Sequence, residues 1–183
     1  KGYLNGPTAN MEDANLPDAK LARGNLFQAV LTAANLTNAN LDDANLYDAD
    51  LTGANLTNAY LANAYLEDAN LTDANLTRVS SGGIVGSPNA LPTNWQLTKG
   101  HLIGQTANLE DANLTAANLA RATLVHTVLT AANLTNENQA DANLSDAAPT
   151  YQHLNTASLA NAYLDHANQT HANLTTDCAQ ASD

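Results

Sequence analysis

Apolar residues recur along this chain with a period of five. A leucine stands at every fifth position from Leu16 to Leu76, and an alanine nearly always stands two residues before it. Asparagine commonly lies between the two, as in Ala34-Asn35-Leu36, and two further residues complete the unit. On an α-helix, five residues rotate the chain by about 140°, and on a flat strand successive leucines alternate faces. A chain that turns a corner every five residues points each leucine at one axis, which predicts a stacked coil.

The leucines of this run form the predicted core ladder. We expect each of them to point inward, with the preceding alanines filling the remaining space. The ladder consists of Leu16, Leu21, Leu26, Leu31, Leu36, Leu41, Leu46, Leu51, Leu56, Leu61, Leu66, Leu71 and Leu76.

The residue after each leucine indicates how many sides the coil has. Similar residues return at every fourth leucine, which is twenty positions further along the chain. Such columns include Thr32, Thr52 and Thr72, and also Phe27, Tyr47 and Glu67. Four pentapeptides per turn would stack these residues, whereas a three-sided coil would place Thr32 beside Tyr47. The pattern therefore favours four sides.

A second block repeats the first at an offset of 98 residues, so that the stretch from Lys1 matches the stretch from Lys99. We expect a first block at residues 1–78, a connector at 79–106 and a second block at 107–183, all in one continuous solenoid. If the sides stay aligned, about 18 connector residues lie outside the coil as a protruding loop. Its serine, glycine and proline residues are turn formers.

These repeats resemble the pentapeptide-repeat family, whose motif is written A(D/N)Lxx, over most of the chain. The connector, with Gly83-Ile84-Val85-Gly86 and Trp95, looks like one that recurs in cyanobacterial-type members. The resemblance implies an all-β fold, a right-handed quadrilateral parallel β-helix with four pentapeptides per coil. It also implies that the central leucine and the alanine before it point inward, while the other three positions face solvent.

Charge and composition narrow the class of partner. The net charge is −12, from 18 acidic and 6 basic residues. We expect no direct binding of nucleic acid, because phosphate requires a positive surface, whereas a basic protein partner suits an acidic chain. No apolar run reaches the ~20 residues of a membrane-spanning helix, so we expect no membrane partner. One cysteine cannot form an intramolecular disulfide or a cysteine metal cluster.

The sequence offers no catalytic motif. It has no nucleophile triad, no phosphate-binding glycine loop and no paired catalytic carboxylates, and a filled interior leaves no pocket. We therefore expect no enzyme activity, no cofactor and no metal site. The column of His126, Asp146 and His166 has suitable metal ligands, but unrelated surface residues are the favoured interpretation. Threonine columns likewise suit a solvent-facing β surface better than an ice-binding lattice.

Three residues are candidates for a functional surface: Trp95, Glu137 and Gln139. Trp95 either anchors the connector on the coil, with Leu91 and Leu97, or stacks on a ligand, and anchoring is favoured. Glu137 takes an inward alanine place and Gln139 a leucine place, at the start of an irregular stretch, 137–152. An unpaired inward charge is costly. Either the coil bulges there, or these groups pair with one another, or the stretch is a functional notch.

The favoured function is a structural or protein-interaction scaffold, a rigid acidic rod that binds a protein partner or itself. Coil ends leave strand edges unpaired and invite addition, so we expect end-to-end stacking or a longer tandem array. The alternative is a DNA-mimic regulator or protector of DNA gyrase. The resemblance implies this alternative, because some family members act on gyrase by imitating DNA.

Overall fold

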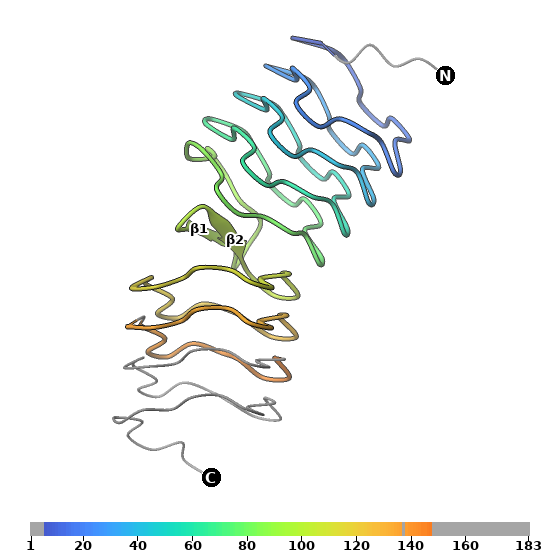
Figure 1. The fold of residues 1–183 in the computed structure, drawn as a ribbon. Coiled ribbons are helices and arrows are strands. Elements are labelled where there is room, and N and C mark those ends of the chain that lie inside the picture. The colour runs from blue at the N-terminus through green and yellow to red at the C-terminus, as the bar shows by residue number, and fades with distance from the viewer. Residues whose placement is uncertain (1–5, 137, 148–183) are drawn as a thin grey trace. The chain divides into compact units, whose positions relative to one another are not determined.

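The computed structural model describes residues 6–136 and 138–147, and it divides the chain into two compact units, Lys1–Thr93 and Asn94–Asp183. Within each unit, parallel bridges join residues that are twenty apart, such as Asn35 and Asn55 in the first or Asn113 and Asn133 in the second. Figure 1 shows the resulting stacks of coils. The expected four-sided parallel β-coil, with four pentapeptides per turn, is confirmed.

Leucine and alanine fill the interior of both units. In the first unit, the ladder leucines from Leu21 to Leu76 are buried, while Leu16 is half-buried. The second unit has its own core cluster, which runs from Ile103 to Ala147 and is built from the same two residue types for the most part. Close packing of these side chains is what excludes water from the axis of each coil.

Every backbone N–H of a regular pentapeptide has a partner. The N–H groups of Asn35, Leu36 and Asn38 donate to carbonyls of the adjacent coils, at N···O distances of 2.8, 2.8 and 2.9 Å. The N–H of Ala39 closes the corner on the Leu36 carbonyl at 2.9 Å. Thr37 donates its N–H and its hydroxyl to the side-chain oxygen of Asn35, at 3.1 and 2.7 Å. The asparagine therefore forms an Asx turn that satisfies the one donor left over by the ladder.

Each corner requires a left-handed backbone at the second residue after the leucine. This residue has φ of +57° at Asn38 and at Asp43, and +65° at Gly53. Together with the closing hydrogen bond, the positive φ is characteristic of a type II turn. Asparagine, aspartate and glycine tolerate this conformation better than other residues, which explains why they are frequent at this position.

The coil continues to Ala90, beyond Arg78, where the pentapeptide motif stops. Ser80, Val85 and Ala90 form parallel bridges with residues of the previous coil, and Ile84 is buried. The first part of the connector is therefore coil, and a protruding loop of about 18 residues in the rest of it remains a prediction. In this stretch, small and β-branched residues replace the leucine and asparagine of the motif, and the coil still forms.

A β-hairpin follows, which the sequence analysis did not predict. Strand β1 (Gln96–Thr98) pairs antiparallel with β2 (His101–Ile103), with Leu97 opposite Leu102. The two residues between the strands, Lys99 and Gly100, have φ of +52° and +75°. Two positive φ values identify a type I′ turn, the connection that best matches the twist of a hairpin. A single continuous solenoid across both units remains a prediction.

Asp50 gives the Asx turn a dependence on pH. Its carboxylate takes the place of the motif asparagine and accepts the N–H of Thr52 at 3.0 Å. The hydrogen bond from the Thr52 hydroxyl is the main reason why the pKa of Asp50 lies below its ordinary value of 3.8. Folding thus favours the ionised form of Asp50. The stabilisation that this carboxylate gives the fold is complete above its ordinary pKa, and it is lost as the pH falls through the lowered pKa of the folded state.

We predict that Asp50→Asn removes this part of the acid sensitivity, because asparagine forms the same turn without titrating. From about pH 5 to pH 3, the free energy of unfolding of the wild type should fall more steeply than that of the variant. Denaturant titrations at each pH measure this difference. Asp73→Asn, at an exposed corner, controls for the loss of one charge. Parallel profiles for the wild type and Asp50→Asn would contradict the prediction.

Candidate functional site: an aromatic hollow on the first unit

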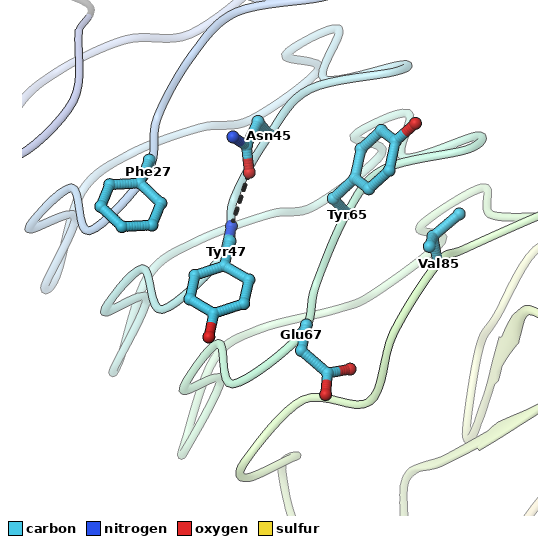
Figure 2. Close-up of a pocket in the computed structure, with 6 residues that line it drawn as sticks. All are labelled: Phe27, Asn45, Tyr47, Tyr65, Glu67 and Val85. Carbon is cyan, nitrogen blue, oxygen red and sulfur yellow. Dashed lines mark hydrogen bonds between the residues drawn. The ribbon is translucent and has the colours of Figure 1, made fainter.

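A hollow of about 400 Å³ lies on the outside of the first unit. It is lined by Phe27, Asn45, Tyr47, Tyr65, Glu67 and Val85, and Figure 2 shows these side chains on neighbouring coils. The twenty-residue period assembles it, because residues 27, 47 and 67 form one column and residues 45, 65 and 85 the next. We call this feature the aromatic hollow.

Two stacked rings form one wall of the aromatic hollow. The centroids of Phe27 and Tyr47 lie 5.4 Å apart with their planes inclined by 15°, close to the coil spacing of about 4.8 Å. The backbone N–H of Tyr47 donates to the side-chain oxygen of Asn45 at 3.1 Å. An aromatic pair of this kind contributes about 0.5–1.5 kcal/mol beyond the area that it buries, and the Asx turn fixes the backbone from which Tyr47 projects.

Three carboxylates act on the Tyr47 hydroxyl. A hydrogen bond to Asp68, together with the charge of that carboxylate, raises the pKa of Tyr47, and the charges of Asp48 and Glu67 act in the same direction. Asp48 also accepts a hydrogen bond from Gln28 at 3.0 Å. The hollow is therefore aromatic on its walls and negative at its border.

Glu67 also repairs a missing Asx turn. Val85 stands where the motif has asparagine, so it cannot accept the N–H of Ser87. Glu67, one coil earlier, accepts that N–H instead, at an N···O distance of 2.6 Å. The carboxylate therefore has a structural partner while its charge remains at the border of the aromatic hollow.

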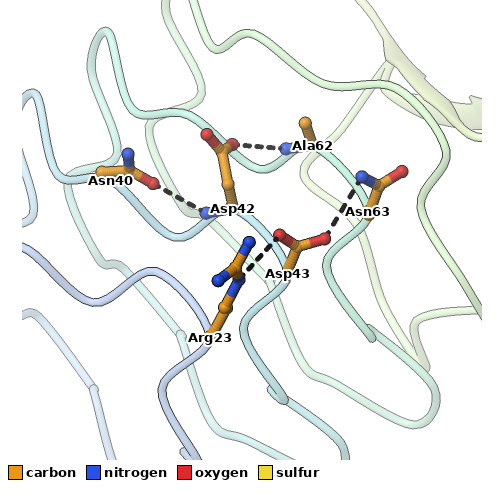
Figure 3. Close-up of polar contacts among 6 residues, drawn as sticks. All are labelled: Arg23, Asn40, Asp42, Asp43, Ala62 and Asn63. Carbon is orange, nitrogen blue, oxygen red and sulfur yellow. Dashed lines mark hydrogen bonds and ion pairs between the residues drawn. The ribbon is translucent and has the colours of Figure 1, made fainter.

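The same repair occurs on a neighbouring side of the coil, as Figure 3 shows. Tyr60 replaces the motif asparagine there, and the N–H of Ala62 donates to Asp42 of the previous coil at 2.9 Å. Beside it, Arg23 pairs with Asp43 at 3.6 Å. Because both side chains are exposed, this ion pair adds little stability. It does, however, offset an acidic charge, whereas among the described residues no ion pair with a base occurs at the aromatic hollow.

Comparison with known proteins identifies the coil. A sequence profile of pentapeptide repeats matches eight copies, over residues 9–47, 44–80 and 107–136, which together make up more than half of the chain. The chain belongs to the pentapeptide-repeat family. Its fold is the right-handed quadrilateral β-helix of that family. No curated protein matches the sequence.

Solved structures of pentapeptide-repeat proteins resemble this one. HetL, involved in heterocyst differentiation regulation in the cyanobacterium Nostoc sp. strain PCC 7120, is 28% identical with a TM-score of 0.44, over 90% of this chain and 72% of HetL. A pentapeptide-repeat protein of the Arabidopsis thaliana thylakoid lumen is also 28% identical, with a TM-score of 0.44. The match covers 58% of this chain and 65% of the lumenal protein. QnrB1, a plasmid-mediated fluoroquinolone resistance protein, is 14% identical, with a TM-score of 0.33. The match covers 90% of this chain and 84% of the QnrB1 chain.

The pentapeptide motif conceals the aromatic hollow in the sequence. Phe27 and Tyr47 belong to a twenty-residue column whose period indicates the number of coil sides. Tyr65 and Val85 replace asparagine in the adjacent column. Large apolar residues at neighbouring outward positions in both columns were the signal that could have located the site.

Trp95 does not line the aromatic hollow; it packs against the core cluster of the second unit. Its ring passes so close to Gly104 that a Cβ atom there would lie 2.3 Å from the ring. Only glycine permits this approach. The half-buried indole therefore has a packing role beside the hairpin.

The two other candidates differ in what the structure describes. Glu137 lies outside the described residues. Gln139 was a candidate for a functional surface, but it occupies a leucine place and its side chain is 0% exposed, so it lies inside the coil. Within the described residues, neither its amide nitrogen nor its oxygen has a hydrogen-bond partner. Thr127, also buried, instead donates its hydroxyl to the Gly104 carbonyl at 3.2 Å.

The histidine column is only partly described. His126 and Asp146 lie 4.0 Å apart, from Nδ1 to Oδ2, whereas His166 lies outside the described residues. Across the described part of the chain, no group of three or more histidine, cysteine, aspartate or glutamate side chains is arranged to hold a metal ion. In the same part, no helix has the length and apolar character needed to cross a membrane.

We predict that Gln139→Leu stabilises the second unit, because it restores the motif residue and removes a buried amide without partners. The expected gain is about 1–3 kcal/mol in the free energy of unfolding, measured by denaturant titration. Leu134→Gln, which places the same amide at another buried ladder position, should have the opposite effect. A loss of stability in Gln139→Leu would mean that the amide has a partner after all.

Proposed function

We propose that this pentapeptide-repeat protein is a non-enzymatic scaffold whose outer faces bind a protein partner. The filled interior carries the proposal, because the buried ladder in the described coils leaves the outside as the place for binding. The net charge of −12 favours a partner with a basic surface.

The backbone ladder supports a scaffold role. Each described coil is hydrogen-bonded to its neighbours along every side, so outward side chains are presented at fixed intervals of about 4.8 Å. A platform of this kind loses little conformational entropy when a partner binds. Its surface can therefore be specific even where individual contacts are weak.

We predict that the immobilised protein retains a protein from an extract of its own source, and that the purified partner binds directly. Salt should weaken the complex, because screening reduces attraction between an acidic and a basic surface. Leu46→Asp is the control for a folded platform, since it places a charge at a fully buried position. The DNA-mimic alternative predicts protection of purified gyrase in a supercoiling assay. Gyrase protection without a basic protein partner would overturn the scaffold proposal.

We also propose that the coils associate end to end or continue in a longer array. An exposed end of a β-coil presents unpaired N–H and C=O groups, which favour addition of another coil. For stacking of separate copies, the average mass from light scattering should increase with salt, because screening weakens the repulsion between acidic chains. A monomer at every salt and protein concentration would contradict stacking.

A further inference from the structure

The aromatic hollow exposes apolar surface that the coil does not need. Tyr47, Tyr65 and Val85 are 38%, 49% and 47% exposed. At the positions of Tyr65 and Val85, the motif residue is asparagine, which would form the stabilising Asx turn. Both residues therefore replace a structural group with an uncovered apolar one. Departures from a local rule of this kind are expected at functional sites.

The charge around the aromatic hollow is uncompensated. Asp48, Glu67 and Asp68 act together on Tyr47, and none of them forms an ion pair among the described residues. On this side of the coil, the twenty-residue columns that include residues 25, 27 and 28 contain no lysine or arginine from position 7 to position 88. A ligand that covers the hollow therefore has to bring positive charge and an apolar or planar part.

Arginine meets both requirements. A guanidinium group stacks on aromatic rings and forms paired hydrogen bonds with carboxylates, whereas an ammonium group is a strongly hydrated point charge. The lining residues come from four successive coils, which span about 14 Å along the coil axis. That length accommodates about four residues of an extended chain.

We propose that the aromatic hollow binds an extended, arginine-bearing segment of a protein partner. Its guanidinium lies against the Tyr47 and Tyr65 rings and pairs with Glu67 and Asp68. An apolar side chain two residues along, on the same face of the extended segment, covers Val85. This assignment rests on the proposed scaffold function and specifies the chemistry of its partner.

The test uses the whole chain and a capped hexapeptide, Gly-Arg-Gly-Leu-Gly-Arg, whose two arginines and leucine share one face when extended. Calorimetric titration should detect saturable binding that weakens with added salt. Replacing both arginines with citrulline, which keeps the shape and removes the charge, should weaken binding at least tenfold. Replacing them with lysine should weaken it by a smaller factor. Equal affinity for the citrulline peptide, or no binding of the arginine peptide, overturns the proposal.

Tyr65→Asn separates binding from structure. It restores the motif residue, so the variant should fold at least as stably as the wild type and yet bind the peptide about fivefold more weakly or worse. Tyr60→Asn makes the same replacement at an exposed tyrosine on a neighbouring side and should leave affinity unchanged. Equal losses in the two variants, or no loss in Tyr65→Asn, overturn the assignment to the aromatic hollow.

A second pair of variants tests the charges. Glu67→Gln with Asp68→Asn removes two carboxylates from the hollow and keeps an oxygen to accept the Ser87 N–H. Glu12→Gln with Asp13→Asn makes the same changes at matching exposed positions of another side. Only the first pair should weaken peptide binding, by about tenfold. Equal effects would indicate general attraction to an acidic chain and overturn the assignment.

Binding of a purified protein partner to the wild type and to the two tyrosine variants distinguishes failure of this proposal from failure of the scaffold function. If a purified partner binds the wild type and both tyrosine variants equally, the scaffold function stands and the assignment to the aromatic hollow fails. If no protein partner is retained, the scaffold function fails even where the arginine peptide binds.

Discussion

The structure depends on how the backbone N–H groups are satisfied at each corner of the coil. Three N–H groups of a pentapeptide pair with adjacent coils and a fourth closes the turn, but one remains. The side chain of asparagine accepts it, as Asn35 does for Thr37. A buried or half-buried donor without a partner is costly, so this local contact makes a sharp corner compatible with a continuous ladder. The inward leucine then follows, because the corner directs each leucine to the axis.

Loss of that asparagine is tolerated when another acceptor can reach the same donor. Asp42 accepts the N–H of Ala62 beside Tyr60, and Glu67 accepts that of Ser87 beside Val85. Both carboxylates come from the coil before, at the same side. Stacked coils can therefore exchange acceptors along a column, which allows the motif position to hold an aromatic or aliphatic residue. The aromatic hollow arises where this exchange coincides with the stacked pair of Phe27 and Tyr47.

The fold was predictable because its determinants repeat. The leucine period gave the inward ladder, and columns such as Thr32, Thr52 and Thr72 gave the number of sides. The structural role of asparagine was not predicted, since a solvent-facing position gives no hydrophobic signal. The hairpin of β1 and β2 was also missed, because its type I′ turn uses Lys99 at positive φ, a conformation that lysine seldom adopts. The aromatic hollow depends on contacts between side chains of different coils, which a single repeat does not contain.

Tyr65 and Gln139 illustrate why departures from the motif differ in meaning. Tyr65 points outward, where replacing asparagine forfeits one hydrogen bond but exposes a ring to possible partners. Gln139 points inward, where an amide without a partner is desolvated and no ligand can reach it. A single departure from the motif therefore destabilises the coil when it points inward, and it changes the binding surface when it points outward. A repeat protein of this kind can change its outer faces widely, because an outward position that loses the asparagine forfeits at most one hydrogen bond, and the previous coil can supply a new acceptor, as it does beside Tyr60 and Val85.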